Sequence, residues 1–191
     1  MNQNLEFLRK IGDLSEASFK KLQCLATYRK FPAKKILVDK TIVPTKVYML
    51  VSGVITAFVN SESGKQFNKR LFTPISFAGA LTAILKNESS KVTYMTLTEC
   101  KVYEIDFEEF KELCRQEFEV GRLYVKLLEH IFITYETRSL DLMRLDATER
   151  YLKLRKQIPN IDNLIPQYQI ASYLNITPVQ LSRIRKKLNF I

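Results

Sequence analysis

Residues 166–188 read PQYQIASYLNITPVQLSRIRKKL, and this stretch carries the clearest structural signal in the chain. Two apolar faces recur in it at helical spacing, made by Ile170, Ala171, Leu174, Leu181, Ile184 and Leu188. Between the two faces, Asn175 tolerates the left-handed backbone that commonly ends a helix. Thr177 is a good N-cap residue, and Pro178 suits the first helical position because its missing N–H would have no partner there. The stretch therefore predicts two short helices joined by a tight turn.

The second of these helices is cationic, and its free faces carry polar side chains. We expect these side chains to meet bases or phosphates: Thr177, Gln180, Ser182, Arg183, Lys186 and Lys187. A helix of this width fits the major groove of B-DNA, where each base pair presents a distinct pattern of donors and acceptors. The pattern thus favours a helix-turn-helix that binds DNA. The simpler alternative is an ordinary helical hairpin with a solvated basic face.

The distribution of charge supports DNA binding. The chain has 191 residues and a net charge of +10. Between Arg150 and Leu188 it has eight Lys or Arg residues and one acid, Asp162, so seven of the ten net positive charges lie in its last fifth. A local basic surface favours phosphate binding because it releases condensed counterions. The rest of the chain is nearly neutral, and we expect it to recognise something else.

Upstream of the basic region, the hydrophobic pattern predicts one helix followed by many strands. Residues 4–26 predict a helix whose apolar side includes Leu14, Phe19, Leu22 and Leu25. Short runs of β-branched and aromatic residues then follow, separated by turn signals, and they predict an antiparallel β-sandwich or roll. The runs are residues 35–38, 47–51, 54–59, 69–72, 92–97 and 101–105.

A second helix is predicted over residues 118–145, about 42 Å long at ~1.5 Å per residue. Val120, Tyr124, Leu127 and Ile131 follow a 4-3-4 spacing, which is typical of a heptad seam. A helix of this length is too long to pack only on a small roll. We therefore expect it to pair with its twin in a homodimer through these four residues. The alternative is a single amphipathic helix that lies along its own domain.

This order of elements resembles the Crp/Fnr-type bacterial transcription regulators over essentially the whole chain. The most specific pieces are Tyr48-Met-Leu-Val-Ser-Gly-Val54, similar to a hairpin turn of the family, and Ala147-Thr-Glu-Arg-Tyr-Leu152, similar to the start of its DNA-binding domain. The resemblance implies an α+β chain with a cyclic-nucleotide-binding-like jelly roll, an antiparallel β-roll, as sensor domain over residues 1–117. A dimerisation helix over 118–145 and a winged-helix-like helix-turn-helix domain over 146–191 would follow. Because the sequence stops at Ile191, we expect almost no wing.

The resemblance also implies an effector pocket, and this sequence departs from the family there. Cyclic-nucleotide binders of the family carry Gly-Glu-Leu and, about ten residues on, Arg-Ser or Arg-Thr, which hold the ribose 2′-OH and the cyclic phosphate. Here Gly79, Ala80 and Leu81 stand in the first motif, and Lys91 lies near the second. Alanine cannot accept from a ribose hydroxyl, and lysine offers a point charge in place of a guanidinium fork. We expect these four residues to form a degenerate pocket that does not bind cyclic nucleotides.

Other chemistry has little support in the sequence. His130 is the single histidine, and no nucleophile, Walker A or dinucleotide-binding motif accompanies it, so we expect no enzymatic activity. Cys24, Cys100 and Cys114 are odd in number and far apart, which favours thiols in a reducing cytoplasm over disulfides or metal ligands. No apolar run approaches the roughly 18 residues that a membrane span needs. We expect no cofactor and no metal.

The favoured hypothesis is therefore a cytoplasmic bacterial transcription regulator. Its expected partners are double-stranded DNA and a second copy of the chain, with an unidentified small-molecule effector and RNA polymerase as further candidates. We expect no membrane partner. The alternative, from another functional class, is a small-ligand sensor domain whose basic C-terminal tail binds a protein or a membrane instead of DNA.

Overall fold

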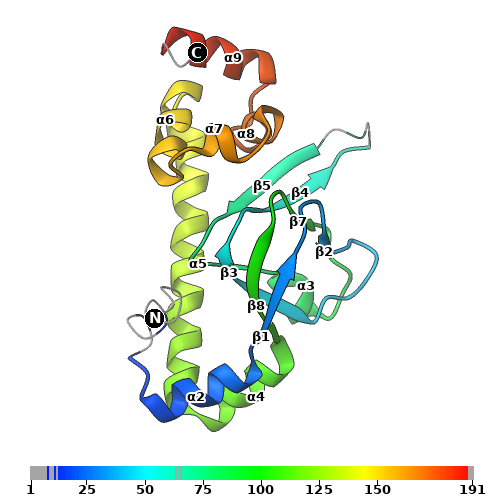
Figure 1. Ribbon diagram of the computed structural model, residues 1–191, viewed down its shortest axis with the longest axis vertical. Coiled ribbons are helices and arrows are strands. Elements are labelled where there is room, and N and C mark those ends of the chain that lie inside the picture. Colours follow the sequence, from blue (N-terminus) through cyan, green and yellow to red (C-terminus); the bar gives the residue numbers. More distant parts are fainter. Residues whose placement is uncertain (1–7, 9–10, 12, 63, 65, 189–191) are drawn as a thin grey trace.

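The centre of the molecule is a β-roll, seen in a computed structural model that describes residues 8, 11, 13–62, 64 and 66–188 (Figure 1). Its strands are β1 Thr27–Phe31, β2 Ile36–Val38, β3 Lys46–Ser52, β4 Ile55–Asn60, β5 Gln66–Phe72, β6 Ser76–Ala78, β7 Thr93–Thr96 and β8 Cys100–Asp106. They form two four-stranded sheets with the orders β1-β8-β3-β6 and β2-β7-β4-β5. All neighbouring pairs are antiparallel, so the expected α+β class with an antiparallel roll is confirmed.

Two strands lie outside the runs that the sequence predicted. They are β1 and β6, which form the two edges of one sheet. The strand β1 reads TYRKF and is almost fully exposed, so it has no apolar alternation to reveal it. It exists because its backbone pairs with β8, from Thr27 opposite Glu104 to Phe31 opposite Cys100. Edge strands of this kind follow from the neighbouring strand more than from their own sequence.

The interior of the roll holds a core of apolar side chains from both sheets, including Leu50, Ile55, Phe72 and Val102. The predicted turn at Ser52-Gly53 joins β3 to β4, and Gly53 has φ +96°. A Cβ at Gly53 would lie 2.3 Å from the carbonyl oxygen of Glu99. Glycine is therefore required for two reasons. The backbone at this position is left-handed, and the carbonyl oxygen of Glu99 leaves no room for a Cβ.

The predicted N-terminal helix is shorter than expected. Helix α2 runs over Glu16–Leu25 and begins at Ser15, whose side chain accepts from the backbone N–H of Ser18. Asp13, just before it, has φ 50°, which interrupts a continuous helix. The first residues of the predicted range 4–26 lie outside the described part of the chain. Figure 1 shows α2 beside α4 (Phe107–Gln116) at one end of the roll.

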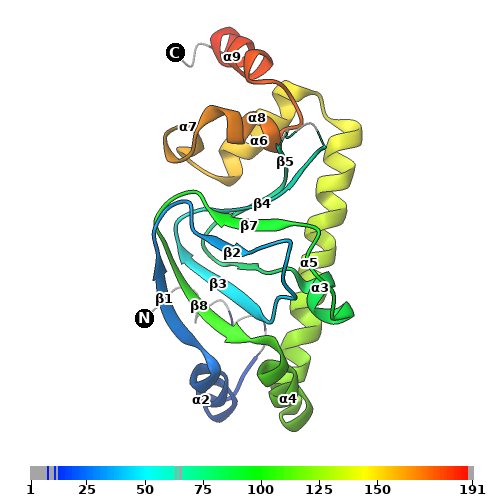
Figure 2. The ribbon, with the colours of Figure 1, turned by 90° about the vertical axis from the view of Figure 1, so that its right-hand side faces the viewer.

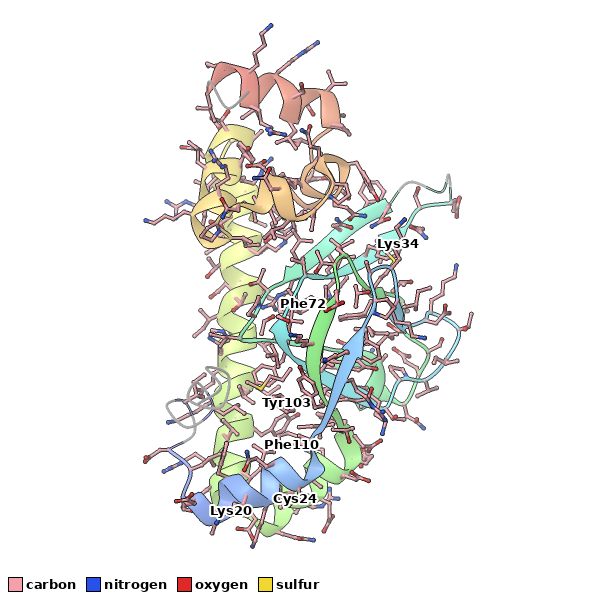
Figure 3. All side chains as sticks on the ribbon, in the orientation of Figure 1. Lys20, Cys24, Lys34, Phe72, Tyr103 and Phe110 are labelled. Atoms are coloured by element: carbon pink, nitrogen blue, oxygen red, sulfur yellow. The ribbon has the colours of Figure 1, made fainter. Side chains whose placement is uncertain are left out.

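The long helix α5 runs over Phe118–Arg144, which confirms the range expected from the sequence. Its first half packs on its own subunit: Val120 is 0 % exposed and Leu127 is 8 % exposed. The Tyr124 ring lies 5.6 Å from the Phe110 ring of α4, and half-buried Ile131 lines cavities beside the roll. Figure 3 places Phe110 and Tyr103 in this same crowded region between the roll and the helices.

The structure therefore corrects the expectation that Val120, Tyr124, Leu127 and Ile131 form a seam between two chains. Val120, Tyr124 and Leu127 belong to the core formed by α4, α5 and the roll, and Ile131 lines the cavities beside it, which is the alternative stated for this helix. The 4-3-4 spacing identified the apolar face correctly. Spacing alone does not say whether such a face meets a second helix or the surface of its own domain.

The C-terminal part consists of α6 (Ala147–Gln157), α7 (Ile161–Leu164), α8 (Gln167–Tyr173) and α9 (Pro178–Lys187). These helices share a core that includes Tyr151, Ile170 and Leu181, and Val54 and Leu71 of the roll pack in the same core. Figure 2 shows the four helices stacked over one end of the roll, with α9 outermost. In the described residues, no helix is both long and apolar enough to cross a membrane.

Candidate functional site

The first candidate site is the outer surface of α9, which a capping box fixes at its start. Thr177 Oγ1 accepts from the backbone N–H of Gln180 at 3.1 Å, and Gln180 Oε1 accepts from the backbone N–H of Thr177 at 2.9 Å. Asn175 has φ 57°, and Pro178 occupies the first turn. Turn, cap and proline thus lie where the sequence predicted them, and they orient α9 rigidly on α8.

The structure brings the predicted binding residues together on the free face of α9. Leu181 is 0 % exposed against the domain core, and the exposed side chains include Gln180, Ser182, Arg183, Lys186 and Lys187. Thr177 is also exposed but serves as the cap. The side-chain carbonyl oxygen of Gln180 accepts a hydrogen bond in the same cap. Only the side-chain amide N–H groups of Gln180 are therefore available for binding without breaking that cap.

One exposed residue of this surface was missed by the sequence analysis. Val179 is 60 % exposed in the first turn of α9, although it is apolar. A small apolar side chain beside the polar residues can contact the C5-methyl group of thymine in the major groove. The signal in the sequence was the position of Val179 outside the face that is formed by Leu181, Ile184 and Leu188.

Four of the eight Lys and Arg residues between Arg150 and Leu188 form ion pairs or hydrogen bonds within the fold and are not free on the surface. Asp162 Oδ2 lies 3.1 Å from Arg155 Nε, and Asp162 Oδ1 lies 3.8 Å from Arg185 Nε. Lys153 Nζ lies 2.6 Å from a carboxylate oxygen of Asp141 on α5, and Arg150 donates to the carbonyl oxygen of Leu145. The available positive charge is therefore concentrated on α9.

The group around Asp162 is a buried polar network. The hydroxyl of Tyr151 donates to Asp162 Oδ1 at 2.8 Å, and Tyr151 is 0 % exposed. Burial, with the hydrogen bond to Asp162, raises the pKa of Tyr151 to about 12. The carboxylate thus joins α6, α7 and α9. It holds the guanidinium of Arg185 away from the outer face of α9.

A second candidate surface is an exposed apolar row along the outer side of α5. The row consists of Val125, Phe132, Ile133, Leu140 and Met143, whose exposed fractions are 53, 66, 59, 46 and 78 %. Val125 and Phe132 are seven residues apart, as are Ile133 and Leu140, a spacing typical of coiled-coil contacts. Large apolar patches of this kind mark interaction surfaces. The heptad spacing noted in the sequence, from Val120 to Ile131, lies on the other face of α5.

The third candidate site is a cavity of about 460 Å³ between the roll, α3 (Leu81–Lys86) and α5, here called the central cavity. Gly79, Ala80, Leu81 and Lys91 all line it, so the structure brings the four predicted effector residues together. Ala80 is 6 % exposed. A cavity of this size lies within the range of roughly 300–1,000 Å³ that is usual for small-molecule sites.

The structure adds two cations of β5 to the central cavity, Lys69 and Arg70. The guanidinium carbon of Arg70 lies 4.9 Å from the centre of the Phe72 ring and 5.2 Å from that of Tyr135 on α5. Lys69 Nζ lies 5.2 Å from the same Tyr135 ring. Figure 3 shows Phe72 beside α5. The family motif predicts an arginine about ten residues after Gly79, so Arg70 was not among the predicted pocket residues. In the fold, Arg70 reaches the cavity from β5, which precedes Gly79 in the sequence.

The strand that carries these cations also contacts the C-terminal helices. The backbone N–H of Asn68 donates to Ser172 Oγ, and this hydroxyl donates to the carbonyl oxygen of Gln66, both at 2.9 Å. Arg138 of α5 donates to the carbonyl oxygens of Lys69 at 3.1 Å and Tyr173 at 2.7 Å. Strand β5 therefore runs from the central cavity to α8 without a break.

Metal and thiol chemistry have little basis in this arrangement. Among the residues that the structure describes, no three His, Cys, Asp or Glu side chains gather where they could hold a metal ion. Cys24 is exposed, Cys100 is buried and Cys114 is half-buried, and all three are free thiols. Burial raises the pKa of the Cys100 thiol, which makes it less reactive.

Comparison with known proteins gives one family match and many structural ones. Residues 28–117 match the family model of the cyclic nucleotide-binding domain. A search of curated proteins finds no match.

Similar folds occur in solved structures of bacterial proteins. The global regulator CLP of Xanthomonas campestris, described as responsive to c-di-GMP, has a TM-score of 0.69 at 15 % identity, with 92 % of each chain covered. FixK2 of Bradyrhizobium japonicum has a TM-score of 0.72 at 16 % identity, covering 86 % of this chain and 85 % of FixK2. A transcriptional regulator of Eubacterium rectale assigned to the Crp/Fnr family has a TM-score of 0.69 at 14 % identity, covering 93 % of this chain and 85 % of that one.

Proposed function

From a chain with a cyclic nucleotide-binding domain match at residues 28–117 and the fold of the Crp/Fnr-type regulators, we propose a DNA-binding transcription regulator without enzymatic activity. It acts as a homodimer and binds double-stranded DNA through α9. Residues 1–117 form the sensor, 118–145 the dimer helix and 146–191 the DNA-binding domain. RNA polymerase is the expected further partner at a promoter.

The observation that carries this proposal is the free face of α9. Arg183, Lys186 and Lys187 are exposed on one short, rigidly capped helix at the outer end of the molecule (Figure 2). In the described part of the chain, no carboxylate forms an ion pair with these three cations, whereas Arg155 and Arg185 contact Asp162. A helix that combines exposed cations and polar groups can enter the major groove, where side chains meet base edges and phosphates.

The exposed apolar row on α5 supports the homodimer. A two-fold dimer through this row would bury Phe132, Ile133 and Met143, which one chain alone leaves in water. It would also present two copies of α9 to one DNA duplex. The operator is then expected to be a palindrome whose half-site centres lie about 34 Å, or one helical turn, apart.

Binding to genomic DNA fragments in a gel-shift assay tests the proposal. The full chain should bind a subset of fragments, and the triple change Arg183→Ala, Lys186→Ala and Lys187→Ala should abolish this binding. A matched control removes the exposed cations Lys30, Lys40 and Lys86, and should bind as the unchanged chain does, because β1, the segment after β2, and α3, which carry these residues, lie away from α9 (Figure 1).

The same assay decides against the alternative of a sensor whose basic tail meets a protein or a membrane. Binding that is equally strong to vesicles of anionic lipid, or absent from every DNA fragment, would contradict the proposed function. A dimer bound through about six α9 cations should lose on the order of 10³-fold in affinity between 50 and 200 mM salt. Binding that is insensitive to salt would also argue against contact with phosphates.

A further inference from the structure

We propose that the central cavity binds an amphipathic anion, with a carboxylate head and an alkyl chain, as the effector of the chain. This inference rests on the proposed function only in calling the ligand an effector. The binding itself follows from the chemistry of the cavity. One part of the cavity is cationic, a second part is apolar, and a largely apolar cavity adjoins it.

The cationic part of the central cavity is formed by Lys69, Arg70 and Lys91. Glu88 is the acidic residue among the described residues that line the cavity, so the positive charge exceeds the negative one. Arg70 is held over two aromatic rings, which fixes the guanidinium beside the cavity, and no carboxylate among the described residues forms an ion pair with it. A planar guanidinium offers paired N–H donors that match the two oxygens of a carboxylate.

The apolar part is formed by Phe77, Leu81, Leu128, Ile131 and Phe132. Phe132 is 66 % exposed in the single chain, so the apolar wall extends from the cavity to the exposed row on α5. These side chains can make dispersion contacts with a hydrocarbon chain but cannot bond a sugar. A ligand that fits both parts must therefore carry its charge at one end only.

A second, largely apolar cavity of about 110 Å³ adjoins the central cavity. The two cavities share Phe77, Gly79, Leu81, Leu128 and Ile131 in their walls. The second cavity reaches further into the core, to Met49, Leu123 and Phe110. Apolar cavities of about 150 Å³ in protein cores stay dry and take up small hydrocarbons such as benzene. The end of an alkyl chain fits this second cavity once it passes the shared side chains.

The polar groups of a nucleotide have a poorer match. Ala80 lines the central cavity but has no acceptor for a ribose hydroxyl. The hydroxyl of buried Ser90 donates to the carbonyl oxygen of Val92 at 2.7 Å, which uses its proton. Burying ribose hydroxyls against the apolar part of the cavity, which Phe77, Leu81 and Leu128 help to form, would cost binding energy, whereas CH₂ groups gain from the same burial. The cavity therefore discriminates by apolar length as well as by charge.

Calorimetric titration with decanoate tests this inference on the full chain. Decanoate should bind, and acetate and decanol should each bind at least roughly tenfold more weakly, because acetate lacks the chain and decanol lacks the charge. Over the series from butanoate to decanoate, affinity should rise about fourfold for each added CH₂ group and then level off when the apolar cavity is full. Equal affinity for decanol, or no dependence on chain length, would overturn the assignment.

Variants locate the head of the ligand. Arg70→Gln should weaken decanoate by roughly tenfold or more, since it removes a charge-assisted hydrogen bond. The control Arg29→Gln removes a strand arginine from the opposite sheet and should leave the affinity unchanged. Thermal unfolding shows whether both variants are folded. An Arg70→Gln protein that is folded and binds decanoate at full strength would overturn the assignment of Arg70.

Gel-shift assays on the same proteins separate this inference from the proposed function. A chain that binds DNA and not decanoate would contradict the proposed ligand and leave the proposed function as a regulator standing. A chain that binds decanoate and no DNA would keep the ligand site and overturn the regulator. If decanoate also changes the affinity for DNA, the ligand is an effector in the full sense.

Discussion

Asn68 Nδ2 donates to two oxygens of Gln169, the side-chain Oε1 at 2.6 Å and the backbone carbonyl at 3.0 Å. The two residues come from β5 and α8, and both are buried, with exposed fractions of 5 and 1 %. Asn68 also lies two positions from Arg70, which lines the central cavity. One strand thus joins the central cavity to the helix on which α9 packs, so a change at Arg70 has a short path to the outer surface of α9.

Asn68→Ala should lower the free energy of unfolding by roughly 1–3 kcal/mol, because it removes two buried hydrogen bonds and leaves Gln169 Oε1 with the longer bond from Gln66 Nε2 at 3.3 Å. The double change Asn68→Ala and Gln169→Ala should cost less than the sum of the single changes, which urea denaturation can measure. The control Asn60→Ala lies at the exposed end of β4 and should have little effect. Strictly additive costs would show that the two side chains do not interact in solution.

Arg183→Ala should cost about 1–3 kcal/mol on the preferred DNA site and reduce the difference between sites. Lys187→Ala should weaken all sequences alike and reduce the salt slope by about one, because a residue late in α9 more readily meets phosphates. Selection of binding sites from random DNA with each variant measures both effects. An unchanged selected motif for Arg183→Ala would mean that Arg183 contacts a phosphate instead of a base.

Ile133→Glu should convert the dimer to a monomer in sedimentation experiments. The change places a charge in the exposed apolar row of α5, where burial against a second chain would leave that charge unpaired. The control Lys30→Glu changes an exposed lysine of β1, on the roll instead of α5, and should stay dimeric. Leu127→Glu is expected to unfold the chain instead, because Leu127 lies in its own core. A dimeric Ile133→Glu protein would place the interface elsewhere.

Asp162→Asn should destabilise the DNA-binding domain by about 1–3 kcal/mol, because buried Tyr151 and the guanidiniums of Arg155 and Arg185 lose a charged partner. Thermal unfolding and DNA affinity should both fall. The control Glu62→Gln removes an exposed carboxylate between β4 and β5 and should change neither. Unchanged stability of Asp162→Asn would show that the network contributes nothing in solution.

Cyclic AMP and cyclic GMP should not bind at physiological levels, although residues 28–117 match the cyclic nucleotide-binding domain. Arg70 can attract a phosphate, but Ala80 cannot accept from the ribose 2′-OH. Calorimetric titration with each nucleotide measures this directly. Micromolar affinity for either nucleotide would refute this expectation. It would also show that binding does not need the glutamate that the family motif has at the position of Ala80.

Local signals in the sequence were sufficient for many elements. Thr177 and Pro178 defined the start of α9, because capping and the geometry of proline depend on a few neighbouring residues. Runs of β-branched and aromatic residues in β3 and β4, and the Ser52-Gly53 turn between them, identified the strands at the centre of the roll. Strand β1 escaped detection because its partner β8 lies about seventy residues away in the sequence, and pairing of this kind leaves no local pattern.

The sequence by itself determined that α5 is a long helix with apolar residues, and that the last helix is cationic. Only the tertiary structure decided which apolar face of α5 meets the roll, leaving Ile133 outside and Leu127 inside. Only the tertiary structure brought Arg70 to Ala80 in the central cavity and Asp162 to Arg185. The physical reason is that periodicity and caps act over a few residues, whereas burial and charge pairing depend on segments that the chain brings together from far apart.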